Sequence, residues 1–176
     1  MVFFTSDLHL GHANIIRLCN RPFSSVKEMD ETIIKNWNRT VGKNDTVYVL
    51  GDFTMLKNSQ SANDYIENLN GKIFFLKGNH DHWMKNYDFS NNNRIFNLGS
   101  YHEESLSQRR FILCHYPFLE WNHFYRGSYH LHGHQHNSKE YNENNIKNNI
   151  RRYDVGVDAN NFTPVSVEKI IKFFES

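Results

Sequence analysis

Polar residues that commonly bind metal ions follow five short apolar runs of this 176-residue chain. They supply carboxylates, an amide and imidazoles, but no thiolate. The candidate ligands are Asp7, His9, Asp52, Asn79, His115, His134 and His136. A zinc ion takes about four ligands, so this set is too large for one ion and predicts a two-metal hydrolytic centre.

The mixture of nitrogen and oxygen ligands indicates which metals fit. Imidazole suits Zn, Mn, Fe, Co and Ni, whereas carboxylate and amide oxygens suit harder ions such as Mn and Mg. We therefore expect two divalent metal ions, with Mn as the first choice and Fe, Zn, Co or Ni as alternatives. The lack of thiolate ligands argues against a structural zinc protein.

The apolar runs that precede the ligands are typical of buried strands. They span residues 2–4, 47–50, 73–76, 111–114 and 129–132. Near-continuous apolar runs of this length indicate strands that are covered on both faces. Ligands of open α/β sheets bind beyond the carboxyl ends of the strands. Strand ends that are far apart in the sequence are therefore expected to converge on one site.

Helical periodicity and a hairpin pattern fill the intervening sequence. Helices are expected at residues 13–19, 26–41, 62–69 and 167–174, a hairpin at 101–105 and 109–114, and a late strand at 153–157. The Asn-rich stretches 91–93 and 142–149 are expected to be surface loops. No internal repeat or linker divides the chain, so the sequence predicts a single domain, residues 1–176, of the α/β class.

The order and spelling of the ligand blocks resemble the calcineurin-like metallophosphoesterase superfamily. Its pattern runs D-x-H, G-D, G-N-H-[DE], a lone H and G-H-x-H. This chain has Asp7-Leu8-His9, Gly51-Asp52, Gly78-Asn79-His80-Asp81, His115 and Gly133-His134-Gln135-His136. One such block alone would carry little weight, but five in the same order, each after a strand-like run, form a specific signal. Residues 6–16 and 19–23 also resemble those of small bacterial and phage members.

The resemblance implies a fold and a division of the ligands. The fold is a four-layer α-β-β-α sandwich, in which two stacked mixed sheets are flanked by helices. One ion would be held by Asp7, His9, Asp52 and His136, and the other by Asp52, Asn79, His115 and His134, so that Asp52 bridges them. The implied reaction is hydrolysis of a phosphomonoester or phosphodiester by in-line attack of a metal-bridging hydroxide.

His80 is the general acid that the resemblance implies. An imidazole titrates near neutral pH, which suits protonation of the leaving oxygen. Asp81 is the second catalytic candidate, because it could raise the pKa of His80 or hold its tautomer; an ordinary loop or helix-start acid is the alternative. The family usually has a further acidic residue after Gly-Asp, where this chain has Phe53-Thr54-Met55.

Several residues near the motifs are candidates for binding substrate phosphate. Asn79, His12 and Arg21 are the first choices, and His82, His123 and Arg126 are further ones. The arginine fork matches phosphate geometry best, although each of these residues also fits a solvated surface position. His130 and His132 alternate with His134 along one strand face. They could hold a ligand in place, or be strand histidines that their neighbours satisfy.

The composition narrows the class of protein. With 39% hydrophobic and 15% aromatic residues, the chain is expected to fold into a packed globule. Its mean hydropathy of -0.70 and the lack of a long apolar stretch argue against a membrane protein. Because no positively charged leader precedes the first motif, the expected location is cytoplasmic.

The net charge of +1 provides no global attraction to nucleic acid. Lys147, Arg151 and Arg152, near Tyr141 and Tyr153, could form a local contact with a single strand, or a solvated edge. The sequence therefore favours a two-metal phosphoesterase that acts on a small phosphoester. A nuclease acting on oligonucleotides and a catalytically weak, metal-stabilised binding module are the alternatives, and the oligomeric state is open.

Overall fold

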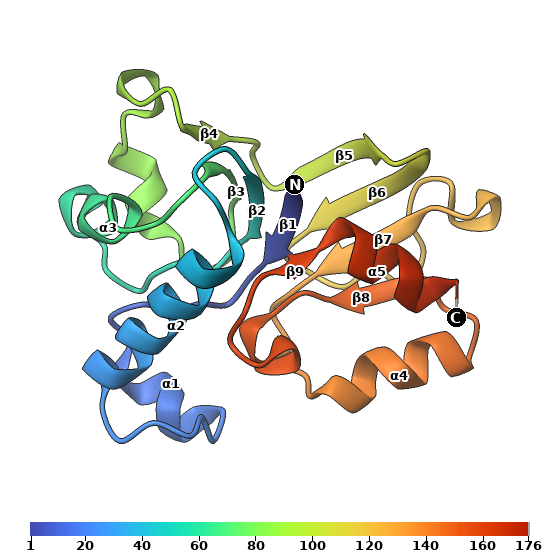
Figure 1. Cartoon of the computed structure of the whole chain (residues 1–176), viewed down its shortest axis with the longest axis horizontal. Coiled ribbons are helices and arrows are strands. Elements are labelled where there is room, and N and C mark those ends of the chain that lie inside the picture. The colour runs from blue at the N-terminus through green and yellow to red at the C-terminus, as the bar shows by residue number, and fades with distance from the viewer. Residues whose placement is uncertain (176) are drawn as a thin grey trace.

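The strands form two sheets that pack face to face. The computed structural model, which describes residues 1–175, is shown in Figure 1. The first sheet has the spatial order β4 (Ile95–Asn97), β3 (Lys72–Leu76), β2 (Thr46–Leu50), β1 (Val2–Thr5) and β9 (Val165–Ser166). Neighbouring strands from β4 to β1 are parallel, whereas β9 is antiparallel to β1.

The second sheet has the order β5 (Tyr101–Leu106), β6 (Arg109–Cys114), β7 (Tyr129–His132) and β8 (Arg152–Asp154). β6, β7 and β8 are parallel to one another, and β5 is antiparallel to β6. This antiparallel pair is the expected hairpin. All five apolar runs that precede the candidate ligands lie in strands, so these five strand predictions are confirmed.

Helices cover the outer faces of both sheets, which confirms the four-layer arrangement (Figure 1). α1 (Ala13–Leu18), α2 (Val26–Thr40) and α3 (Ser59–Ile66) pack against the first sheet, and α4 (Lys139–Lys147) lies along β8 of the second. α5 (Val167–Phe174) packs into the core between the sheets. Three of the expected helices are confirmed to within a residue at each end. The helix expected at 62–69 both begins and ends three residues earlier.

Alternating side chains of the first sheet divide between two apolar cores. Phe3, Val49 and Phe75 face the helices and share a core with Trp37 of α2. The opposite face meets the second sheet, where the core includes Phe4, Tyr48, Leu50, Leu76, Phe111, Leu113, Tyr129 and Leu131. Because both faces of the central strands are buried, these strands are apolar throughout and stand out in the sequence.

Local sequence sets the start and the buried face of α2. The Ser25 hydroxyl accepts from the Glu28 N–H at 3.2 Å, which satisfies one of the free donors at the helix start. Met29, Ile33 and Trp37 then recur at helical spacing and are buried against the first sheet. The cap and the apolar stripe together explain why this helix is predictable from sequence.

Short 3-10 helices occupy several connections: η1 (His82–Asn86), η2 (Phe89–Asn91), η3 (Phe124–Arg126) and η4 (Val157–Asn160). The strand expected at 153–157 is shorter than predicted, because β8 ends at Asp154 and the chain turns into η4 after Gly156. The loop expected at 91–93 overlaps η2 at its first residue only. Within residues 1–175, none of the helices has the combination of length and hydropathy that crossing a lipid bilayer requires.

The prediction of a surface loop at 142–149 is wrong, because most of this stretch belongs to α4. Asparagine is a poor helix former, since its side chain competes for backbone hydrogen bonds. Here the Asn142 amide is buried; it donates to the Asp154 carbonyl at 3.0 Å and accepts from the Asp154 N–H at 2.7 Å. Asn145 donates to the Arg152 carbonyl at 3.1 Å. Tertiary hydrogen bonds override the local preference and cover the edge strand β8.

We predict that Asn142→Ala destabilises the fold. The variant loses both bonds and leaves the buried Asp154 N–H without its side-chain acceptor. The free energy of unfolding, measured in urea, should fall by about 1–3 kcal/mol. Asn144→Ala, at an exposed position of the same helix, is the matched control and should be neutral or slightly stabilising. An equal loss in both variants would contradict this account of α4.

Candidate metal centre

Two loops at the carboxyl ends of β1 and β2 run side by side and place the first carboxylates. The Asp7 N–H donates to the Gly51 carbonyl, and the His9 N–H donates to the Asp52 carbonyl, both at 3.0 Å. These bonds continue the parallel pairing beyond the strand ends. Asp7, His9 and Asp52 are all buried, with 2% exposure or less. Buried carboxylates need compensation, which a cation supplies well.

The second sheet joins this edge through hydrogen bonds to Asp7. The Gly133 N–H, after β7, donates to the carbonyl of His115, after β6, at 3.0 Å. The His134 N–H then donates to both oxygens of the Asp7 carboxylate, at 3.1 and 3.0 Å. Strand ends from both sheets therefore converge on one place.

The loops that carry the ligands turn sharply. Five ligand residues have a left-handed backbone with positive φ: Asp7 (56°), His9 (52°), Asp52 (54°), His134 (73°) and His136 (49°). Residues other than glycine adopt this region rarely, although Asp and His do so more readily than most. Two glycines let the loops touch, because an added Cβ at Gly78 would lie 2.3 Å from Asp52 Oδ1, and one at Gly133 would lie 2.1 Å from Asp7 Oδ2.

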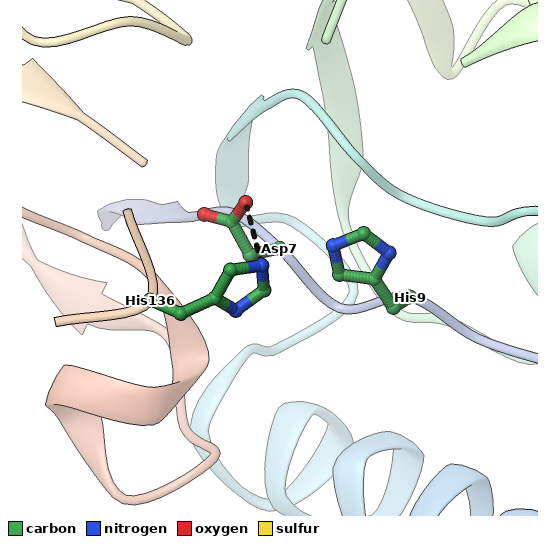
Figure 2. Close-up of side chains that lie close together, drawn as sticks. All are labelled: Asp7, His9 and His136. Atoms are coloured by element: carbon green, nitrogen blue, oxygen red, sulfur yellow. Dashed lines mark ion pairs between the residues drawn. The ribbon is translucent and has the colours of Figure 1, made fainter. Parts of the chain in front are cut away.

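Asp7, His9 and His136 form the first ligand group (Figure 2). Their ligand atoms all lie within 4.8 Å of one another. The His136 Nε2 atom is 3.9 Å from Asp7 Oδ1, and the His136 ring faces that of His9 with 5.0 Å between the centroids. One divalent cation can contact ligand atoms that are spaced in this way.

Asp52 connects the first group to a second one. Its Oδ2 atom lies 3.6 Å from His9 Nε2 and 3.4 Å from His115 Nε2. The Asn79 Oδ1 atom is 2.9 Å from the same His115 nitrogen. The His134 ring lies edge-on to His115, with 5.0 Å between the centroids. A carboxylate between two such groups can serve two ions at once.

The His9 ring fits a metal ion better than it fits the surrounding protein. Both of its nitrogens are buried, yet neither has a hydrogen-bond partner within residues 1–175. A buried polar atom without a partner costs about 1–3 kcal/mol. Burial lowers the pKa of His9 to about 3, although Asp52 acts in the opposite direction. The ring is therefore neutral at physiological pH, and a lone pair is available to a cation.

The carboxylates and His115 form a coupled set of charges. Burial raises the pKa of Asp7 to about 6, although His115 and His136 act against it. Burial alone would also raise the pKa of Asp52, but the neighbouring His115 lowers it to about 2. Burial would lower the pKa of His115, but Asp52 and Asp7 raise it to about 9. A metal ion that binds His115 would have to displace this proton.

His80 lies at the rim of the centre, beside the Asp52 carboxylate. The backbone N–H of His80 donates to Asp52 Oδ1 at 2.8 Å, and the ring Nε2 atom is 4.0 Å from Asp52 Oδ2. The ring meets His9 edge-on, with 5.5 Å between the centroids, and the side chain is 39% exposed. This exposure leaves the ring accessible to a substrate, as a proton donor requires.

Asp81 has a different role from the one that the sequence predicts. Its carboxylate is buried and accepts four hydrogen bonds of 2.7 to 2.9 Å. The donors are the backbone N–H groups of Asp52, Phe53 and Gly78 and the indole N–H of Trp83. Both oxygens are engaged, and no hydrogen bond among the described residues joins Asp81 to the His80 ring. Asp81 is therefore a positioning residue that clamps the loop after β2 to the loop after β3.

Arg21 is also placed differently from the prediction that it binds substrate. The side chain is buried, and its guanidinium makes a bidentate pair with Asp158, with both bonds at 2.9 Å. It also donates to the carbonyls of Asp7 at 2.7 Å and Leu8 at 3.0 Å. Arg21, which follows α1, therefore binds the backbone of the loop after β1 on its buried side. In this position the side chain cannot reach a substrate phosphate.

Asp158 is the residue that the sequence reasoning missed. Its Oδ2 atom accepts from His136 Nδ1 at 2.8 Å, which directs the opposite ring nitrogen toward the first ligand group. Burial would raise the pKa of Asp158, but hydrogen bonds from His136 and Arg21 lower it and keep the carboxylate ionised. A signal was present, because Asp158 directly follows the strand expected at 153–157, as the other carboxylates follow theirs.

The other candidates for phosphate binding divide between the centre and more distant places. The His12 ring lies beside the centre, 5.5 Å from the His9 ring between centroids, and its buried Nδ1 has no hydrogen-bond partner in the described part of the chain. His82 is exposed at the start of η1. His123 and Arg126 lie in the connection that precedes β7, at the opposite end of that strand from the ligands.

His130 and His132 lie on the outer face of β7 and are fully buried. The His130 ring accepts from the Phe118 N–H at 3.1 Å, and the His132 ring bonds the Tyr141 hydroxyl at 3.1 Å. Within residues 1–175, neither ring has a hydrogen bond to a ligand side chain. The sequence left two interpretations open. This geometry fits the second, in which His130 and His132 are strand histidines whose hydrogen bonds are satisfied by neighbouring residues.

The family model of calcineurin-like phosphoesterases matches residues 1–158. The chain belongs to the calcineurin-like phosphoesterase family. The matched range includes both ligand groups, His80 and, as its last residue, Asp158. Members of this family are usually metal-dependent hydrolases, which agrees with ligand groups suited to divalent ions.

Relatives of this calcineurin-like phosphoesterase cover nearly its whole length. An uncharacterized protein of Methanocaldococcus jannaschii is 38% identical over 177 residues, which span 99% of this chain and 91% of that protein. The gene 66 protein of Mycobacterium phage D29 is 28% identical over 181 residues, which span 90% and 88%. The crystal structure of a protein of unknown function from Aquifex aeolicus has a TM-score of 0.70 and 26% identity, and the match covers 98% of both chains.

We predict that Asp158→Asn weakens metal binding at the first ligand group. The substitution removes the charge that supports His136 and leaves Arg21 uncompensated. Supporting residues of this kind typically contribute about 10–100-fold to metal affinity. Calorimetric titration with Mn measures the effect, and Asp64→Asn, an exposed acid on α3, is the control. Unchanged affinity for both ions would show that His136 needs no support from Asp158.

Proposed function

We propose that this protein hydrolyses a small phosphomonoester or phosphodiester with the help of two divalent metal ions. The observation that supports this most directly is the position of Asp52 Oδ2, which lies 3.6 Å from His9 Nε2 and 3.4 Å from His115 Nε2. Two cations that are close together repel, and a shared carboxylate reduces that repulsion. Family membership supports the same chemistry.

The ligands divide into two sets that share one residue. Asp7, His9, Asp52 and His136 would hold one ion, and Asp52, Asn79, His115 and His134 would hold the other. Bound ions would supply an activated water and would stabilise the negative charge on the phosphoryl oxygens. Mn is our first choice, and Fe, Zn, Co and Ni are alternatives, because nitrogen and oxygen donors are mixed.

His80 is proposed to donate a proton to the leaving oxygen. Its backbone is fixed by the bond to Asp52, while its partly exposed ring faces the rim of the centre. A water nucleophile makes a covalent enzyme intermediate unnecessary. A metal-stabilised binding module would not need an accessible proton donor, so the position of His80 favours an enzyme.

The rim suits a small substrate in an open site. Asn79, which belongs to the second ligand set, and His12, which lies beside His9, are proposed to contact the substrate phosphate. The Tyr116 ring packs against His134 with 4.7 Å between the centroids and is 44% exposed. Its exposed face offers an apolar surface to the alcohol part of the ester.

We predict that hydrolysis depends on divalent metal. A chelator should abolish activity on a panel of phosphomonoesters, phosphodiesters and oligonucleotides, and adding each metal in turn should identify the ion that restores it. The preferred member of the panel would distinguish a phosphatase from a phosphodiesterase or a nuclease. Full activity in a preparation shown by elemental analysis to be metal-free would exclude the proposed mechanism.

We predict that His80→Ala slows hydrolysis according to the leaving group. For an alkyl ester, kcat/KM should fall by roughly 10²–10⁴, the usual contribution of a general acid. A nitrophenyl ester needs little protonation of its leaving oxygen, so its loss should be much smaller. Metal content should stay at the parent level, because His80 is outside both ligand sets.

Lys85→Ala is the control for this variant. It removes an exposed side chain of η1, further along the same connection, and should leave both rates unchanged. An equal decrease for both esters in His80→Ala would assign His80 to phosphate binding and remove it from the role of general acid.

A further inference from the structure

Four arginines line a hollow at the end of the second sheet opposite the metal centre. We call this hollow the arginine pocket and define it by Arg109, Arg110, His123, Arg126 and Arg151. Its volume is about 430 Å³, and none of the described residues that line it is acidic. The chain as a whole has a net charge of only +1, so this concentration of positive charge is local.

The topology of the sheet separates the arginine pocket from the metal centre. β6, β7 and β8 are parallel, so their amino ends lie together at one edge of the sheet. Arg109 begins β6, Arg126 closes η3 shortly before β7, and Arg151 directly precedes β8. The ligand His115 follows the far end of β6, which is six residues long, or about 20 Å at the usual rise per residue.

Two of the arginines already have acidic partners. Arg109 pairs with Glu175 at 2.6 Å, and Arg110 lies 3.6 Å from Glu103. Arg110 also lies 2.9 Å from His123 Nε2. An arginine can only donate, so the Nε2 atom of His123 accepts this bond.

The other two arginines are not compensated. Arg126 and Arg151 are exposed, and within residues 1–175 neither has an ion pair with an acidic side chain. Both border the same hollow, so two free guanidinium groups face one volume of solvent. A bound anion would reduce their mutual repulsion and use their donors.

We propose that the arginine pocket binds the phosphate groups of a polyanion. Guanidinium forks match phosphate oxygens, and four of them can engage more than one phosphate. The volume falls within the range of about 300–1,000 Å³ that is usual for small-molecule sites. A nucleoside triphosphate and the backbone of a single-stranded nucleic acid share this chemistry. The site is additional to the proposed hydrolysis and does not depend on it.

The structure also changes the composition of the basic cluster that the sequence suggested. Arg152 donates to the Phe118 carbonyl at 2.7 Å and lies over the Tyr141 ring, so it has a structural role. Tyr153 is buried and cannot stack on a base. Of that basic cluster, Arg151 lines the pocket, together with His123 and Arg126, which the sequence offered as candidates for phosphate binding.

The test compares two double variants that each remove two exposed positive charges. Arg126→Gln/Arg151→Gln alters the pocket, and Arg17→Gln/Arg39→Gln, on α1 and α2, is the matched control. The probes are ATP, measured by calorimetry, and a labelled oligothymidylate of about 12 nucleotides, measured by fluorescence anisotropy. Any binding at the metal centre is common to both variants and cancels in the comparison.

We predict that the affinity of the pocket variant for at least one probe falls by about tenfold or more, while that of the control falls by less than about twofold. For the oligothymidylate, the slope of log affinity against log salt should become shallower by about 1.4, which is about 0.7 for each phosphate of a single strand that an arginine no longer neutralises. Metal-dependent hydrolysis should be unchanged in the pocket variant. Arg126→Lys/Arg151→Lys, which keeps the charge, should recover part of the affinity.

Each outcome has a defined meaning. A loss of affinity in the pocket variant that is larger for ATP than for the oligothymidylate identifies a nucleotide site. A larger loss for the oligothymidylate identifies a nucleic-acid site, and either result supports the proposal. Equal decreases in the pocket and control variants would overturn it. Hydrogen exchange on the unaltered chain is an independent measurement, because a bound probe should protect amides in residues 123–129. Absence of protection there at saturating probe would also overturn the proposal.

Discussion

Four donors converge on the Asp81 carboxylate, and the geometry of the candidate metal centre depends on that convergence. The loop after β2 turns its N–H groups toward the interior, where water cannot satisfy them. Each donor left unpaired would cost about 1–3 kcal/mol, so the loop is stable only with an acceptor in this position. Asp81 supplies that acceptor from the loop after β3. The location of Asp52, between both ligand groups, follows from this clamp.

A second buried network connects the helical layer to the centre. Arg21, which follows α1, contacts the backbone of the β1 loop and the Asp158 carboxylate, and Asp158 contacts His136. A planar guanidinium with five donors suits this position, because it bonds two carbonyls and a carboxylate at the same time. The charge of Arg21 compensates Asp158, which in turn orients a ligand. The helices against the first sheet are thus coupled to a ligand carried by the second.

Sequence reasoning predicted the residues that converge because each follows a strand. Asp7, Asp52 and His115 are examples. Parallel strands that are buried on both faces produce apolar runs, and the end of each run shows where the strand ends. Asp81, Arg21 and Asp158 were misjudged or missed, because their roles depend on which atoms they meet. Arg21 and Asp158 are 137 positions apart, and no local pattern reports that contact. The asparagines of α4 show the same limit, because their partners belong to β8 and to no neighbour in the sequence.

The left-handed backbone at five of the seven candidate ligand residues affects how substitutions in this centre would be interpreted. Any residue with a Cβ carries strain of about 1 kcal/mol or more at positive φ, whereas glycine adopts that region freely. Replacing His9 or His136 with alanine keeps the Cβ, so it removes the candidate ligand and leaves the backbone strain in place. Replacing either with glycine removes the candidate ligand and releases that strain in one step. Asn79 and His115 lack this complication, because their φ values are ordinary. At the five others, comparing an alanine with a glycine variant would separate loss of coordination from release of backbone strain.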